Sequence, residues 1–295
     1  IRLALGGDKV SYFGFSYGSK LGAVYATMFP GDLRAMVIDG ASDPSGYTVD
    51  TRQATVGIER AFDKALDACS ANRRCPFGNG DAGGAFDKLW AKLDSEPVPV
   101  SADGRPPVGQ GVALYGIVST LYQEGSWPAL YQALAALQDG NGDPMLDLYD
   151  QYLERSGDGS WSNAWEGLYA INCLDDPGPT DPAQIDQQAK DLGVLAPRLG
   201  LASNTDYKCA FWPAKQKPPI TITGKDAGPI VVVGTTGDPV TPIESTRNMA
   251  ASLEKGVLVT VDANQHTGYM VNDCIVRAVD GYLVNLKVPA ANTTC

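Results

Sequence analysis

The segment VSYFGFSYGSKLGAVYA, residues 10–26, places Ser16 in a G-x-S-x-G pattern. An apolar and aromatic run, Val10–Phe15, precedes the serine and is typical of a buried strand, and Lys20–Met28 has the composition of a helix. A strand, a sharp turn and a helix are the context of a nucleophile elbow, in which small flanking residues let the backbone bend and expose the hydroxyl. The pattern therefore predicts a nucleophilic Ser16, and the alternative is a glycine-rich turn that contains a serine by chance.

A serine hydroxyl is a weak nucleophile until a base removes its proton, and the usual base is histidine. The chain contains one histidine, His266, and it comes shortly after the apolar strand run Gly256–Ala263. Loops that follow the strands of α/β enzymes carry their sites. If Ser16 acts through an imidazole, His266 must be the base; the alternative is a histidine of the core or the surface.

The acid that orients the imidazole is expected on a loop after an earlier strand. Asp238, in GTTGDPVTP, directly follows an apolar strand run, although an aspartate at this place is also a common turn residue. Asp262 and Asp39 compete for the role, but Asp262 lies inside a strand run and Asp39 ends the strand nearest the elbow. The order Ser16, Asp238, His266 is the order of α/β-hydrolase triads, so we expect Asp238 to be the acid.

Such a triad carries out acyl transfer through an acyl-enzyme on the serine. The tetrahedral oxyanion needs hydrogen-bond donors, and one is expected to be the main-chain N–H of Tyr17, the residue after the nucleophile. The second donor normally comes from a loop after an early strand. Every strand run of this sequence lies at or after the elbow, so we expect the second donor to be missing from it.

Composition excludes several function classes. The formal charge of −11 over 295 residues argues against nucleic acid or an anionic membrane as a partner. No run of 18 apolar residues is present, so no transmembrane span is predicted. One histidine and no C-x-x-C pair argue against a metal site, and no nucleotide-binding motif is found, so no cofactor is expected.

The strand runs lie at the two ends of the chain, and the middle is mainly helical in pattern. Continuous Val and Ile runs suit a parallel sheet that is covered on both faces. We therefore predict an α/β-hydrolase fold with a mostly parallel sheet and a large helical cap insertion, in which the first strands of the usual core are absent. The expected boundaries are residues 1–45 for the elbow part of the core, 46–225 for the cap, and 226–295 for the part of the core with the Asp and the His.

Six cysteines in a chain of this size are either thiols, metal ligands or disulfides. Cys69 and Cys75 bracket a short polar loop, and Cys274 is placed to tether the last residue, Cys295. Cys173 and Cys209 then remain as the third pair. Disulfides at these places indicate an oxidising, extracytoplasmic compartment.

With these residues in hand, the chain resembles the secreted actinobacterial tripeptidyl-aminopeptidase and carboxylesterase-A family of α/β-hydrolases. The resemblance runs along the whole chain and is carried by YFGFSYGSKLGAVYATMFP, INCLDDP, CAFWP, TTGDPVTP, NQHTG and AANTTC. It implies a serine exopeptidase that removes short peptides from free N-termini, with esterase activity on simple esters, a cap domain and export. The family's catalytic serine, aspartate and histidine fall on Ser16, Asp238 and His266.

The chain departs from the family at its front, because members begin with about four further strands and a Gly-Gly-Pro-Gly type loop that supplies the other oxyanion donor. The sequence therefore resembles the downstream part of a larger enzyme, and an upstream segment of the same protein is an expected partner. Membrane association is expected only through a lipid anchor on such a segment.

An aminopeptidase must also hold the substrate ammonium, for which a desolvated carboxylate is the natural partner. The candidates are Glu166, Asp175 and Asp176, whose alternative role is that of solvated loop acids. Thr241 is a further candidate substrate contact from the loop of Asp238. Two other functions stay open at this point: a carboxylesterase on short acyl or lipid esters, and a non-catalytic peptide-binding fragment that needs the upstream segment.

Overall fold

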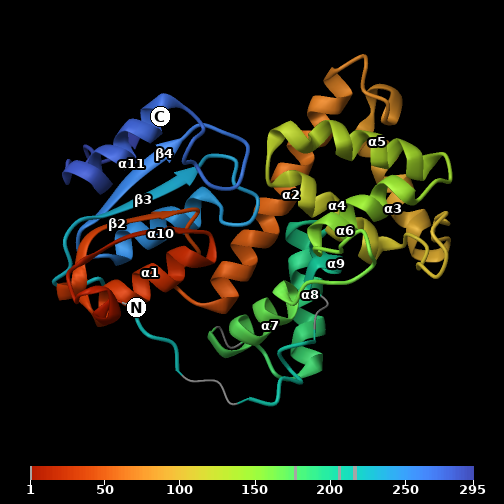
Figure 1. The fold of residues 1–295 in the computed structure, drawn as a ribbon. Coiled ribbons are helices and arrows are strands. Elements are labelled where there is room, and N and C mark those ends of the chain that lie inside the picture. Colours follow the sequence, from red (N-terminus) through yellow and green to blue (C-terminus); the bar gives the residue numbers. More distant parts are fainter. Residues whose placement is uncertain (1, 176–177, 205–206, 215–217) are drawn as a thin grey trace. The chain divides into compact units, whose positions relative to one another are not determined.

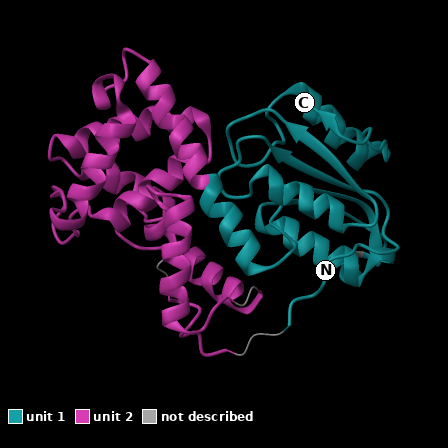
Figure 2. Ribbon diagram, turned by 180° about the vertical axis from the view of Figure 1, so that it is seen from behind, with its two compact units in different colours: residues 1–57, 218–295 teal, residues 58–217 magenta. Residues whose placement is uncertain are grey.

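The computed structural model describes residues 2–175, 178–204, 207–214 and 218–295. The chain forms two compact units (Figure 2). Residues 1–57 and 218–295 form the first, here called the core unit, and residues 58–217 form the second, here called the helical unit.

The core unit is built on a parallel sheet of five strands in the order β1-β2-β3-β4-β5 (Figure 1). The strands are β1 (Val10–Phe15), β2 (Leu33–Asp39), β3 (Ile230–Thr235), β4 (Gly256–Val261) and the short β5 (Thr293–Thr294). The pairing of β2 with β3 joins two segments that are far apart in the sequence. It brings the end of the strand after the elbow next to the strand that precedes Asp238.

Helices cover both faces of this sheet, with α1 (Tyr17–Met28) and α10 (Ile243–Ser252) on one face and α11 (Asp273–Asn285) on the other (Figure 1). Successive side chains of a strand point to opposite faces. Ile38 therefore packs in the cluster that contains α1 and α10, while Val37 packs in the cluster that contains α11. Burial on both faces explains why the strands read as continuous apolar runs.

The helical unit has its own hydrophobic core, in which Phe62, Phe86 and Leu134 are buried. Helix α2 (Tyr47–Ala71) runs from the core unit into it. Its other helices are α3 (Ala82–Ser95), α4 (Gln110–Leu121), α5 (Trp127–Gln138), α6 (Asp143–Tyr152), α7 (Ala164–Asp175), α8 (Pro182–Leu195) and α9 (Gly200–Asn204). Short 3₁₀ turns occur in the two units at Leu3–Leu5, Pro30–Asp32, Gly78–Gly80 and Glu124–Ser126.

The division into units differs from the boundaries expected at 45/46 and 225/226. The first turns of α2 belong to the core unit, because Asp50 accepts the N–H of Asp43 at 2.7 Å. A Cβ on Gly57 would lie 2.6 Å from the carbonyl oxygen of Pro239, so this part of the helix also packs closely on the core unit. At the other boundary, Ile222 is buried in a core-unit cluster and draws the segment from residue 218 into that unit.

The structure contains the disulfides Cys69–Cys75, Cys173–Cys209 and Cys274–Cys295, the same pairs that were expected from the sequence. The last one ties the chain end to α11, next to β5. No helix in the part of the chain that the structure describes is both long and apolar enough to cross a membrane.

Candidate active site

Ser16 lies at the sharp turn between β1 and α1, with φ 53° and ψ −122°. Residues other than glycine rarely adopt this backbone conformation, so contacts with the surrounding residues must stabilise it. A Cβ on Gly14 would lie 2.5 Å from the carbonyl oxygen of Gly18 and equally close to the Tyr12 ring, so the first position must be glycine. The Tyr12 hydroxyl donates to the carbonyl of Gly18 at 2.6 Å and fixes the other side of the turn.

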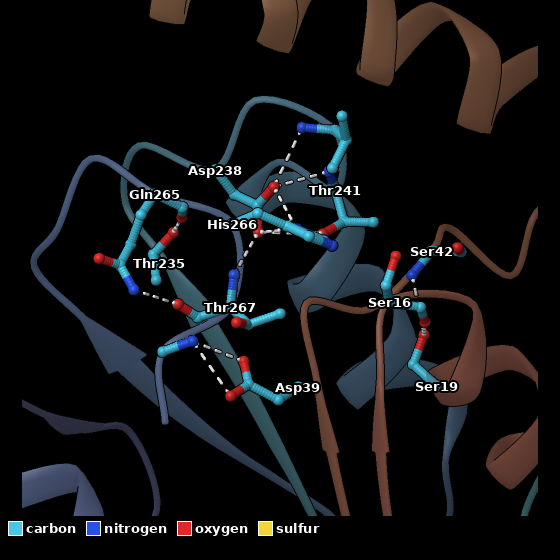
Figure 3. Close-up of polar contacts among 12 residues, drawn as sticks. Ser16, Ser19, Asp39, Ser42, Thr235, Asp238, Thr241, Gln265, His266 and Thr267 are labelled. Carbon is cyan, nitrogen blue, oxygen red and sulfur yellow. Dashed lines mark hydrogen bonds and ion pairs between the residues drawn. The ribbon is translucent and has the colours of Figure 1, made fainter. Parts of the chain in front are cut away.

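The elbow is also tied to the end of β2. The N–H of Ser16 donates to the main-chain carbonyl of Asp39 at 2.9 Å. The buried hydroxyl of Ser19 donates to the carbonyl of Ser16 at 2.6 Å and accepts the N–H of Ser42 at 3.2 Å (Figure 3). These bonds set the position of the serine from the neighbouring strand.

His266 and Asp238 form a close pair. Nδ1 of His266 lies 3.0 Å from Oδ1 and 2.9 Å from Oδ2 of Asp238 (Figure 3). The side chain of His266 is 7% exposed and that of Asp238 is 0% exposed, so water competes little for this contact. A carboxylate only accepts hydrogen bonds, so Nδ1 carries the proton and the neutral ring has its lone pair on Nε2. This is the tautomer that a general base toward a serine needs.

Four further donors hold the Asp238 carboxylate. Oδ1 accepts the N–H groups of Val240 at 3.0 Å and Thr241 at 2.8 Å. Oδ2 accepts the Thr241 hydroxyl at 3.0 Å and the N–H of Thr267 at 3.2 Å. Thr241, expected as a substrate contact, therefore binds the acid of the Asp–His pair, and a contact with substrate stays a prediction. Its place three residues after an aspartate in a tight turn is the sequence signal that could have identified this role.

Gly40 lies between the serine and the histidine. It follows Asp39, whose main-chain carbonyl accepts the N–H of Ser16, and it has φ +66°. A Cβ on Gly40 would lie 3.0 Å from Cε1 of His266 and 3.1 Å from Oγ1 of Thr241. Ser16 and His266 thus lie at either end of the short Asp39–Gly40 segment, and the imidazole points toward the serine side chain (Figure 3). The structure brings all three expected triad residues to one edge of the sheet.

Both competitors of Asp238 have other partners. The exposed Asp262 accepts the hydroxyl of Thr236 at 2.8 Å. The Asp39 carboxylate is 0% exposed and accepts the N–H groups of Gly268 at 2.8 Å and Tyr269 at 2.7 Å. Burial raises the pKa of Asp39 above its ordinary value, and these two N–H bonds oppose the effect. This role of Asp39 could not be predicted from the sequence, because its partners are main-chain groups near the other end of the chain.

The other expected site residues lie directly after Ser16 or in the helical unit. Tyr17 is the first residue of α1, so its main-chain N–H is at the positive end of that helix. Glu166 and Asp175 lie in the first and last turns of α7 in the helical unit, and both are exposed. Asp176 lies outside the described residues. A role of these residues toward substrate stays a prediction.

Comparisons with known proteins identify several similar chains. A family model described as "TAP-like protein" matches residues 199–295. The chain is 34% identical to the serine protease Hip1 of Mycobacterium tuberculosis over 311 aligned positions, with 100% of this chain and 59% of the relative covered. It is 30% identical to the tripeptidyl aminopeptidase of Streptomyces lividans, with 100% of this chain and 56% of the relative covered.

A third relative is the carboxylesterase B of Mycobacterium tuberculosis, which is 33% identical over 284 positions. Here the alignment covers 89% of this chain and 52% of the relative. The chain therefore spans a little over half the length of the curated relatives that it matches.

Proposed function

Because the chain belongs to the TAP-like family of α/β-hydrolases, we propose that it carries the acyl-transfer centre of a serine hydrolase. Ser16 is the nucleophile, His266 the base and Asp238 the residue that orients the imidazole. The observation that carries this proposal is the buried Asp238–His266 hydrogen bond beside a serine in a strained elbow.

In the first half of the reaction, Nε2 of His266 takes the proton of Ser16 as Oγ attacks the substrate carbonyl. The negative charge that forms on the carbonyl oxygen is stabilised by the main-chain N–H of Tyr17. When the tetrahedral intermediate collapses, the imidazolium gives its proton to the leaving amine or alcohol. A water molecule then repeats the sequence on the acyl-enzyme and releases the acid and the free serine.

We propose peptides with a free N-terminus as the substrates. Two of the similar proteins are named serine protease and tripeptidyl aminopeptidase, which supports this choice. An aminopeptidase needs a carboxylate for the substrate ammonium, and Glu166 and Asp175 are our candidates. A carboxylesterase on short acyl esters is the second candidate function, because a relative carries that name and the chemistry at the serine is the same.

Rates on three substrates separate these functions: a tripeptide anilide with a free amine, the same anilide with an acetylated amine, and a short acyl ester. An aminopeptidase is expected to cleave the free anilide about tenfold or more faster than the blocked one, because the acetylated amine has no positive charge to pair with the carboxylate that holds the ammonium. Glu166→Gln and Asp175→Asn should reduce this ratio. Asp94→Asn, at an exposed acid of α3, is the matched control. Equal rates on both anilides with a faster ester reaction would favour the esterase.

We propose that the protein acts outside the cytoplasm, which its disulfides support. We also propose that an upstream segment of the same protein supplies the second oxyanion donor. Labelling by a serine-directed probe with and without that segment tests the second proposal. A chain that binds peptides but never reacts in either form would instead be a peptide-binding fragment.

A further inference from the structure

Asp39 is the second buried carboxylate of this edge of the sheet. It ends β2, is 0% exposed, and accepts the main-chain N–H groups of Gly268 and Tyr269. An ionised carboxylate in such a place is costly to bury unless it is hydrogen-bonded. The triad chemistry described above does not use this group.

The segment that Asp39 holds is strained and directly follows the base. Thr267 has φ +68°, which is unfavourable for a β-branched residue. Its N–H binds Asp238 at 3.2 Å, and the next N–H, that of Gly268, binds Asp39 at 2.8 Å. A Cβ on Gly268 would lie 2.8 Å from Val261, so the segment also packs tightly on the sheet. Two carboxylates therefore fix the backbone that follows His266 in a conformation it would not adopt alone.

Asp39 also contacts the nucleophile, through its main-chain carbonyl. The main-chain carbonyl of Asp39 accepts the N–H of Ser16 at 2.9 Å. The side chain of Asp39 accepts the N–H groups of Gly268 and Tyr269, which follow His266. One residue thus contacts both the nucleophile elbow and the segment of the base. A shift of about 1 Å between such groups can reduce a rate by up to about a hundredfold.

We propose that Asp39 is a positioning residue for acyl transfer: its carboxylate fixes the strained His266–Tyr269 segment, and with it the imidazole, relative to Ser16, and its negative charge favours the imidazolium that forms during the reaction. This inference rests on the proposed serine hydrolase function. It assigns a role to a residue that is not a member of the triad.

Electrostatics agree with this placement. After the larger effect of burial, the negative charge of Asp238 further raises the pKa of Asp39, and the His266 ring lowers it. These are the charged groups that act on Asp39. Two carboxylates act on His266: that of Asp238, on the loop after β3, and that of Asp39, at the end of β2. The nearby side chains of Thr241 and Ser16 are uncharged hydroxyls. Removal of the Asp39 charge leaves Asp238 as the counter-charge of the imidazolium.

Asp39→Asn is the test variant, because it keeps the shape, removes the charge and turns one acceptor into a donor that faces an N–H group. Asp43→Asn is the matched control: Asp43 is also buried and follows β2, but it binds Ser45 at 2.8 Å and Asn248 at 2.6 Å. The first readout is the second-order rate of inactivation by a fluorophosphonate. We expect a fall of about tenfold to a hundredfold for Asp39→Asn and less than about threefold for Asp43→Asn.

The second readout does not depend on activity, because His266 is the sole histidine of the chain. Its ring resonances in an NMR spectrum report directly on protonation, and their change with pH is expected to move to lower pH in Asp39→Asn, where a nearby negative charge is lost, and not in Asp43→Asn. The acid limb of the inactivation rate should move with it. If the wild-type chain does not react at all, but the His266 resonances still differ between the wild type and Asp39→Asn, the proposed function is contradicted and the coupling of Asp39 to His266 stands.

Asp39→Glu separates position from charge, since it keeps the carboxylate and displaces it. The rate is expected to fall while the titration of His266 stays near the wild-type value. Wild-type rate and titration in folded Asp39→Asn would overturn the proposal. So would the failure of both Asp39 variants to fold while Asp43→Asn folds, because Asp39 would then be a purely structural residue.

Discussion

The hydroxyl of Thr241 lies 3.0 Å from Oδ2 of Asp238, and the N–H of the same residue lies 2.8 Å from Oδ1. The two contacts hold both oxygens of the carboxylate that faces Nδ1 of His266, and the same hydroxyl lies 3.2 Å from Nδ1. The orientation of the acid is therefore set by a residue three positions further along the chain.

Thr241→Val tests this arrangement, because it removes the hydroxyl and keeps the shape of the side chain. One neutral donor to a charged acceptor contributes about 1.5 to 3 kcal/mol, so kcat/KM is expected to fall about tenfold to a hundredfold. Thr241→Ser keeps the donor and should stay within about threefold of the wild type. Equal rates for the valine and serine variants would show that the hydroxyl does not orient Asp238.

Ser16→Gly should separate stability from activity. Ser16 has φ 53° and ψ −122°, a conformation that costs a side-chain residue about 1 to 3 kcal/mol and that glycine adopts without strain. Because glycine also makes the unfolded chain more flexible, the net gain in the free energy of unfolding is expected to be about 1 kcal/mol. Urea unfolding measures it, with Ser19→Gly as a variant that should only destabilise. A less stable Ser16→Gly chain would mean that the elbow is not strained.

Gly40→Ala should displace the imidazole. The new methyl group would lie 3.0 Å from Cε1 of His266, and Gly40 has φ +66°. We expect the inactivation rate by a fluorophosphonate to fall about tenfold or more, since the ring must move away from the serine. Gly31→Ala, where the added Cβ would contact nothing within 4 Å, is the control. A wild-type rate in Gly40→Ala would contradict the close approach at this glycine.

The helical unit offers a prediction on pH. The buried hydroxyl of Tyr131 donates to the carbonyl of Ala65 at 2.8 Å, and burial, with a smaller effect of Glu124, raises the pKa of Tyr131 to about 12. Below the unfolded value of 10.0 both states hold the proton, and the hydrogen bond stabilises the fold by about 1 kcal/mol. Between 10.0 and about 12 only the folded state keeps the proton, so stability falls as the pH rises.

Tyr131→Phe tests that sign. At pH 8 the variant should be about 1 kcal/mol less stable than the wild type in urea unfolding. The difference should shrink as the pH rises above 10, because only the wild type carries this titrating group. A difference that grows with pH would place the pKa of Tyr131 below its unfolded value and contradict the buried hydrogen bond.

Much of the core unit could be predicted from the sequence. The strand runs are rich in Val and Ile because the sheet is buried on both faces, and β1 was expected with its observed limits, Val10–Phe15. The triad could be found because the chain has one histidine and few aspartates that follow strand runs. Asp39 was weighed only as the acid itself, since its bonds to Gly268 and Tyr269 span most of the chain and leave no local pattern.

The rest was less predictable for physical reasons. Helices α3 and α4 contain interior or first-turn glycines, which weaken a helix, and their packing in the helical core compensates. The two residues of β5 have no sequence signal and are held by the Cys274–Cys295 disulfide and by the pairing with β4. The two compact units divide near Gly57 and not at the expected 45/46, because α2 is continuous from Tyr47 to Ala71.

Reaction of Ser16 with a fluorophosphonate tests the central claim most directly. The adduct is mapped by mass spectrometry of the wild-type chain and of two variants. His266→Ala removes the base, and Ser252→Ala, at a serine of α10, is the control. We predict an adduct on Ser16 in the wild type and in Ser252→Ala, and its loss in His266→Ala. A folded wild-type chain that forms no adduct on Ser16, alone or with the proposed upstream segment, would contradict the assignment of the triad.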